Sequence, residues 1–132
     1  MTDKHELKKL IIAEDDEDIL TIIQISLEEL PNLQLKLCRT GQEVIQEAIN
    51  FIPDMIILDV MMPNMDGIAT FKALQLIPVL ANVPVVFMTA KAQVRDIEEY
   101  LKLGVLDVII KPFDPLLLPE IISACWRKSF NR

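Results

Sequence analysis

Residues 10–16 read Leu-Ile-Ile-Ala-Glu-Asp-Asp, an apolar run that ends in three consecutive acids. A continuous apolar run of this length is typical of a strand that is covered on both faces, as in a parallel sheet. Residues 55–59, Met-Ile-Ile-Leu-Asp, repeat the pattern of an apolar run closed by an acid. Because ligands gather at the carboxyl ends of parallel strands, both stretches predict an acidic site at one edge of a sheet.

The rest of the chain supplies further strands and the helices between them. Strands are predicted at 10–13, 33–37, 55–58, 85–88 and 108–110, and the alternating pattern of 33–37 indicates an edge strand. Helical spacing is found at 19–30, 42–51, 68–76 and 94–103, and a last helix starts within 114–120 and ends near 130. The apolar positions of the first two helical patterns include Ile22 and Ile49. Strands that alternate with helices predict a doubly wound α/β domain with a five-stranded parallel sheet.

Charge and length restrict the class of protein. The 132 residues carry a net charge of −7, and five of the 20 acids are consecutive, at 14–18. Such a chain is a poor candidate for binding nucleic acid by itself, because that binding needs clustered Lys and Arg. The length predicts one domain, at 8–130, after a short tail at 1–7 that contains the single histidine, His5.

The sequence predicts a cytoplasmic protein that does not enter the membrane. The longest uncharged stretch, 73–90, is interrupted by Pro78 and Pro84, and the charged N-terminus lacks the apolar block of a signal peptide. Cys38 and Cys125 fit no zinc or redox spacing, so reduced and partly buried thiols are expected. Trp126 fits either the core or a partner surface, and the sequence does not decide between them.

Polar residues stand where four of the predicted strands end. Glu14 and Asp15 follow the first strand, Asp59 closes the third, Thr89 ends the fourth, and Lys111 follows the fifth. Converging carboxylates repel each other unless a cation lies among them, and hard oxygen ligands suit Mg²⁺, which also accepts phosphate oxygens. Acids that precede a helix also cap its free N–H groups, so a purely structural role stays open for part of the acidic run. We expect residues 16–18 to serve mainly in that way.

These residues, taken in order, carry a family resemblance. The chain resembles the receiver domain of two-component response regulators, in particular single-domain regulators of the chemotaxis type, over residues 8–130. The residues that carry it are Glu14-Asp15, Asp59, Met62-Pro63-x-Met65-Asp66-Gly67, Thr89-Ala90 and Lys111-Pro112-Phe113. The resemblance implies a flavodoxin-like sheet with strand order 2-1-3-4-5 and five helices.

The resemblance also implies roles for individual residues. Asp59 would be the phosphoacceptor, taking a phosphoryl group from a histidine of a sensor kinase or a histidine phosphotransfer protein. Mg²⁺ would be held by Glu14, Asp15, Asp59 and the main-chain carbonyl of Met61. The side chains of Thr89 and Lys111 would contact the phosphoryl oxygens, and the Lys111-Pro112 peptide bond would be cis.

Four positions depart from the usual family pattern. The family often has an aromatic switch residue three positions before the lysine, where this chain has Val108, so output should depend more on the loop and helix after Thr89. The first metal position is Glu14 rather than the commoner aspartate. Neither Met61 nor Lys91, two residues past Asp59 and Thr89, can readily orient a hydrolytic water, which predicts slow self-dephosphorylation.

The leading functional hypothesis is a stand-alone receiver that signals by binding a downstream protein in trans. It would be no enzyme, apart from assisting its own phosphorylation and dephosphorylation. The surface formed by the fourth helix, fifth strand and fifth helix would bind the target or a second copy. The alternative is a receiver excised from a longer transcription factor or hybrid kinase. A hydrolase of the aspartyl-phosphate type would want an aspartate where Met61 stands, and the complete set of site residues argues against a docking module that is never phosphorylated.

Overall fold

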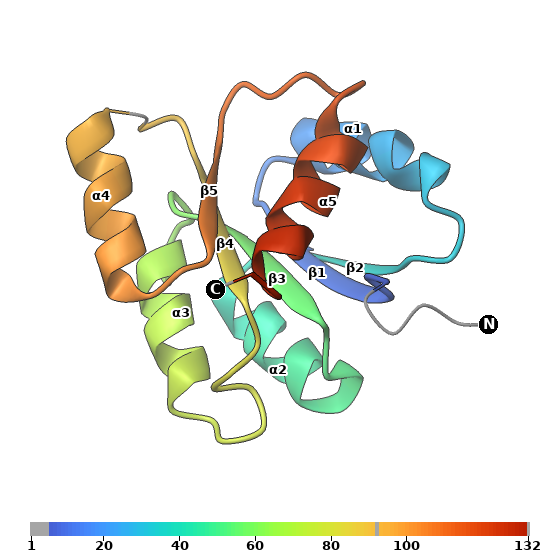
Figure 1. The fold of residues 1–132 in the computed structure, drawn as a ribbon. Helices are drawn as coiled ribbons and strands as arrows, with labels where there is room; N and C mark the ends of the chain where they lie inside the picture. The colour runs from blue at the N-terminus through green and yellow to red at the C-terminus, as the bar shows by residue number, and fades with distance from the viewer. Residues whose placement is uncertain (1–5, 92, 132) are drawn as a thin grey trace.

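The computed structural model describes residues 6–91 and 93–131, which form a five-stranded parallel sheet with helices on both faces (Figure 1). The sheet has the order β2-β1-β3-β4-β5, so the predicted flavodoxin-like fold is confirmed. The elements, in chain order, are β1 (Lys9–Ala13), α1 (Glu17–Ser26), the 3₁₀ helix η1 (Leu27–Glu29), β2 (Gln34–Cys38), α2 (Gly41–Phe51), β3 (Met55–Asp59), α3 (Gly67–Gln75), β4 (Val85–Thr89), α4 (Val94–Leu103), β5 (Asp107–Ile110) and α5 (Leu118–Lys128).

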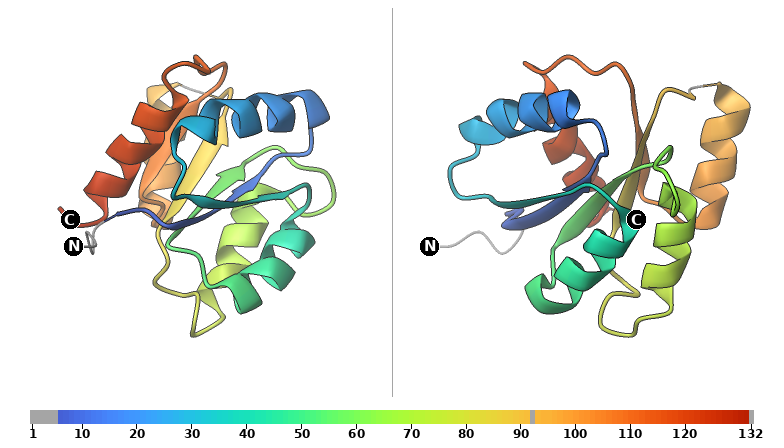
Figure 2. Two further views of the ribbon diagram at one scale, coloured as in Figure 1. Left: turned by 90° about the vertical axis from the view of Figure 1, so that its right-hand side faces the viewer. Right: turned by 180° about the vertical axis from the view of Figure 1, so that it is seen from behind.

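The sheet separates two apolar clusters. Helices α1 and α5 cover one face, and α2, α3 and α4 cover the other (Figure 2). Strands β1, β3 and β4 lie between neighbours, and every residue of β3 and β4 is buried. Their continuous apolar runs are therefore explained by burial on both faces. Strand β2 lies at an edge of the sheet and is only partly buried, as its alternating pattern predicts.

Side-chain caps determine where several helices begin. The carboxylate of Asp16 accepts hydrogen bonds from the backbone N–H groups of Asp18 and Ile19, at 2.8 and 3.2 Å, so α1 starts directly after it. The acids Glu17 and Asp18 lie in the first turn, where they complement the helix dipole. The structural role predicted for residues 16–18 is thus confirmed.

The predicted end of the first helix is wrong. The first helix ends as an α-helix at Ser26 rather than continuing to residue 30, because the chain tightens into η1. Ile22 and Ile49 follow the apolar spacing of α1 and α2 but are 40% and 48% exposed, so they lie outside the buried faces of these helices. In both helices the face that is buried against the sheet contains fewer residues than the apolar pattern does. Apolar spacing alone therefore does not show which residues are buried. The last helix begins at Leu118, inside the predicted window, with a proline in its first turn.

Cys38 and Cys125 are buried and free, in agreement with the predicted reduced thiols. Burial raises the pKa of each thiol to about 12, so neither is a reactive thiolate near neutral pH. Trp126 is partly buried and packs edge-to-face against Phe130 on the α1–α5 side of the sheet. Among the described helices, none has the length and apolar character needed to span a bilayer. His5 lies outside the described residues.

Candidate functional site

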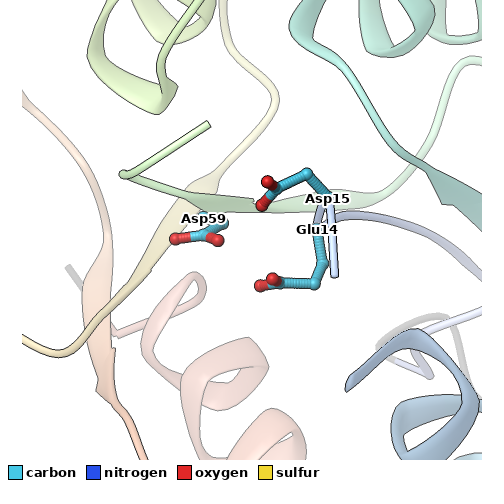
Figure 3. Close-up of side chains that lie close together, drawn as sticks. All are labelled: Glu14, Asp15 and Asp59. Atoms are coloured by element: carbon cyan, nitrogen blue, oxygen red, sulfur yellow. The ribbon is translucent and has the colours of Figure 1, made fainter. Parts of the chain in front are cut away.

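Three carboxylates converge at the carboxyl ends of neighbouring strands. Glu14 and Asp15 follow β1, and Asp59 is the last residue of β3, which pairs directly with β1. Their side chains point toward one another, and one oxygen from each lies within 4.8 Å of the others (Figure 3). Glu14 and Asp59 are only 1% and 3% exposed, whereas Asp15 is partly exposed at the opening of the site.

Lys111 reaches this acidic cluster from the segment after β5. Its ammonium lies 2.6 Å from Oε2 of Glu14 and 3.0 Å from Oδ2 of Asp59, so one cation bridges two buried carboxylates. The backbone N–H of Lys111 donates to the carbonyl of Thr89, which ties this segment to the end of β4. The following Lys111-Pro112 peptide bond is cis.

Backbone groups hold the other carboxylate oxygens. Oδ1 of Asp59 accepts a hydrogen bond from the N–H of Met61 at 3.1 Å, and Oε1 of Glu14 accepts one from the N–H of Asp16 at 3.2 Å. These bonds fix the orientation of both carboxylates before any ligand arrives. The side chain of Met61 is 69% exposed and lies outside the core.

Burial and mutual charge shift two pKa values in the site. Desolvation by burial and the neighbouring Asp59 carboxylate raise the pKa of Glu14 to about 7, although Lys111 acts in the opposite direction. Burial by itself would lower the pKa of Lys111, but its hydrogen bonds to Glu14 and Asp59 outweigh that effect and raise the pKa. Lys111 therefore stays protonated, while the charge that Glu14 contributes to the cluster changes near neutral pH.

Thr89 completes the rim on the other side of Asp59. It is fully buried at the end of β4, and its hydroxyl oxygen accepts a hydrogen bond from the N–H of Lys91 at 3.0 Å. The position of this hydroxyl is consequently coupled to the loop that leads into α4. Val108, in β5, is partly buried and lies opposite Phe87 of β4 in the sheet register.

The turn after Asp59 approaches the site with its backbone. Asp66 caps α3 by accepting from the N–H of Ala69 at 2.8 Å, and Gly67 follows as the first residue of that helix. A Cβ atom at Gly67 would lie 2.6 Å from the carbonyl oxygen of Asp59 and 2.9 Å from Cα of Val60. Only glycine fits this close approach of two backbone segments.

The structure places the five predicted side chains, those of Glu14, Asp15, Asp59, Thr89 and Lys111, at one edge of the sheet, but two features of this edge were not predicted from the sequence. The bridge from Lys111 to Glu14 depends on the direction of two long side chains, for which spacing gives no signal. The second feature is Tyr100, the one tyrosine of the chain and the only buried residue of α4, which the helical spacing of 94–103 does not distinguish from its apolar neighbours. The available signal was that Tyr100 is the one aromatic residue among the apolar residues of this helix.

The sequence matches the response regulator receiver domain over residues 10–123. This chain belongs to the response regulator receiver domain family. Receivers act in two-component phosphorelay signalling, which makes this a signalling domain rather than a conventional enzyme. They interact with histidine kinases or phosphotransfer proteins and typically bind Mg²⁺.

Relatives of this receiver occur in proteins of more than one kind. It is 34% identical over 122 residues to the alkaline phosphatase synthesis transcriptional regulatory protein PhoP of Bacillus subtilis, covering 92% of this chain and 50% of PhoP. It is 30% identical over 123 residues to the signal transduction histidine-protein kinase BarA of Escherichia coli, covering 92% of this chain and 13% of BarA. The chain thus spans half or less of the length of these relatives.

Solved structures share the fold closely. The chemotaxis response regulator CheY4 of Vibrio cholerae superposes with a TM-score of 0.81 at 22% identity, over 91% of this chain and 99% of that one. The receiver domain of a signal transduction histidine kinase from Syntrophus aciditrophicus gives 0.76 at 31% identity, over 91% and 90%. The first likeness is one of fold alone, whereas the second extends to sequence.

Proposed function

We propose that Asp59 accepts a phosphoryl group from a phosphohistidine of a sensor kinase or phosphotransfer protein. One observation carries the proposal: Asp59 is a buried carboxylate at a strand end, held by Lys111 and the N–H of Met61, with two further acids beside it. An isolated carboxylate is costly to bury, so this arrangement favours a function that uses its charge.

The transfer needs positioning more than covalent chemistry from the protein. An oxygen of Asp59 attacks the phosphorus in line; the new O–P bond forms as the N–P bond to the donor imidazole breaks, and the imidazole keeps the bonding electron pair. The Lys111 ammonium, already 3.0 Å from Asp59, is placed to neutralise a phosphoryl oxygen as a point charge. The Met61 N–H keeps Asp59 in one orientation during the attack.

The donor set fits magnesium. Glu14, Asp15 and Asp59 offer only hard oxygen ligands, and the main-chain carbonyl of Met61 is proposed as a further one. When bound, magnesium supplies positive charge that screens the approach of an anionic phosphoryl group to the carboxylates. Without it, three acids share a single lysine, which leaves an excess of negative charge in a buried site.

We further propose that Thr89 reports the phosphorylation. Its hydroxyl can donate to a phosphoryl oxygen on Asp59, and the same oxygen holds the N–H of Lys91. A displacement of the hydroxyl toward the phosphoryl group would therefore move the loop after β4, a local charge event with a distant effect.

The output would be a change in protein binding. We propose that residues 8–130 form the receiver and that the surface of α4, β5 and α5 binds a downstream protein or a second copy. The two free, buried thiols suit a cytoplasmic location. The same site would serve equally in a transcription factor or hybrid kinase, since PhoP and BarA contain a region like this chain within a longer protein.

Labelling with a small phosphodonor tests the proposal. Acetyl phosphate and Mg²⁺ should phosphorylate the wild type at one residue, identified by mass spectrometry as Asp59. Asp59→Asn keeps the shape of the side chain and should remain unlabelled, and chelation of Mg²⁺ should abolish labelling of the wild type. Equal labelling of wild type and Asp59→Asn would overturn the site assignment.

A further inference from the structure

Helix α4 has one buried side chain, that of Tyr100, and one partly buried aliphatic side chain, that of Ile97. Of its ten residues only Tyr100 is buried, at 7% exposure, whereas Val94 and Leu101 are 73% and 44% exposed. The residue before the helix, Gln93, makes no side-chain cap to its free N–H groups. A helix with so few buried contacts lies at the low-stability end of a fold and moves readily when its anchor moves.

Tyr100 meets the sheet at Phe87. The two rings pack edge-to-face, with centroids 5.4 Å apart and an interplanar angle of 85°. Phe87 is fully buried and makes a second edge-to-face contact, at 5.9 Å, with Phe71 of α3. Because edge-to-face pairs have a preferred geometry in a close-packed core, a shift of Phe87 is transmitted to both rings.

Phe87 is also connected to the phosphorylation site. It lies two residues before Thr89 in β4, so both side chains project from the same face of the strand. Its partner across the sheet is Val108, which has no ring to reorient. The rings that pack on Phe87 come instead from the helices: Tyr100 from α4 and Phe71 from α3.

We propose that Tyr100 couples α4 to the phosphorylation state of Asp59, through Phe87 and Thr89. This inference rests on the proposed function of Asp59. When Thr89 moves toward a phosphoryl group, the end of β4 moves with it, and the contact between Phe87 and Tyr100 carries that displacement into α4. Tyr100 is a positioning residue in this scheme, because it touches neither the phosphoryl group nor the metal ligands.

The chain offers a direct probe, since it has a single tyrosine. Incorporation of 3-fluorotyrosine gives one ¹⁹F resonance that reports on Tyr100 without any substitution. Addition of Mg²⁺ and beryllofluoride, a phosphoryl mimic, should shift this resonance by more than its linewidth in the wild type and leave it unchanged in Asp59→Asn. A wild type that is labelled by acetyl phosphate but shows no shift would overturn the coupling.

Hydrogen exchange of α4 tests the mechanical role. With the mimic, amide exchange in residues 94–103 should change in the wild type and in Tyr100→Phe, which keeps the ring, but not in Tyr100→Ala. Phe130→Ala, which removes an edge-to-face pair on the opposite side of the sheet, is the matched control and should respond like the wild type.

The outcomes separate the two proposals. A wild-type response of α4 in Tyr100→Ala would overturn the coupling and leave the phosphoacceptor role intact, provided that acetyl phosphate still labels Asp59. Failure of acetyl phosphate to label Asp59 in the wild type would overturn the proposed function, and the coupling with it. If Tyr100→Ala does not fold, the ¹⁹F measurement on the wild-type sequence still decides the question.

Discussion

Replacement of Lys111 by methionine should destabilise the metal-free protein by about 3 kcal/mol. The substitution removes the ammonium that lies 2.6 Å from Glu14 and 3.0 Å from Asp59, and leaves two carboxylates that are 2% and 4% exposed. Two charges whose oxygens lie within 4.8 Å repel each other by about 3 kcal/mol at an effective dielectric constant of about 20. Loss of one partner from a buried ion pair typically costs about 3–5 kcal/mol, which is consistent with this value.

The loss should depend on pH and on magnesium. The pKa of Glu14 is raised to about 7, so the folded protein holds a proton that the unfolded chain releases near pH 4.5. This group therefore favours the folded state at low pH, and the contribution is lost as the pH rises to about 7. In Lys111→Met, protonated Glu14 is not repelled by Asp59, so the decrease in the free energy of unfolding should be smaller at pH 6 than at pH 8. Mg²⁺ should reduce the loss at pH 8 by replacing the missing cation.

Urea unfolding at pH 6 and pH 8, with EDTA or with excess Mg²⁺, measures these effects. Lys128→Met is the matched control, because Lys128 lies 2.7 Å from Asp107 in an ion pair whose side chains are 58% and 25% exposed. An exposed pair of this kind contributes about 0–1 kcal/mol, and its loss should not respond to Mg²⁺. A Lys111→Met variant that is no less stable than Lys128→Met, or that gains no more from Mg²⁺ than the wild type, would refute the reasoning.

Two other changes test the neighbourhood of Asp59. Gly67→Ala should lower the free energy of unfolding by about 2 kcal/mol or more, because the added Cβ would lie 2.6 Å from the carbonyl oxygen of Asp59. The same substitution should slow the labelling of Asp59 by acetyl phosphate. Urea unfolding measures the first effect and the labelling rate the second; an unchanged labelling rate would show that the backbone moves without disturbing the site. Self-dephosphorylation should be slow in the wild type, because the exposed side chain of Met61 has no group that can orient a water molecule. It should be faster in Met61→Asn, whose amide can do so. Loss of radiolabel measures the lifetime of the phosphoryl group, and a wild-type lifetime of seconds rather than minutes would count against the prediction.

The fold could be predicted because its signals are local and redundant. Continuous apolar runs followed by acids correctly predicted β1 and β3. Capping residues such as Asp16 marked the starts of helices whose apolar spacing was already visible in the sequence. The gathering of acids at one edge follows from parallel strands, whose carboxyl ends all face the same way. These inferences needed only the order of residues along the chain.

The remainder depends on side-chain directions in three dimensions. Nothing in the spacing reveals that Lys111 contacts Glu14 as well as Asp59, because that bridge depends on the length and rotamers of two flexible side chains. The apolar spacing also did not predict that Ile22 is exposed, because an apolar residue in a helix need not face the sheet. The packing of Tyr100 on Phe87 joins segments that only the folded sheet brings together.

The sheet separates two apolar clusters that can be altered by mutation separately. The cluster beneath α1 and α5 shares no residue with the cluster that contains Phe87 and Tyr100. Substitutions in the helices on opposite sides of the sheet should therefore combine nearly additively where the two sites are well separated. Substitutions in the cluster beneath α1 and α5 could then change the free energy of unfolding without changing the response of α4 to phosphorylation. In a phosphorylation sensor built on this domain, stability and response could therefore be set separately.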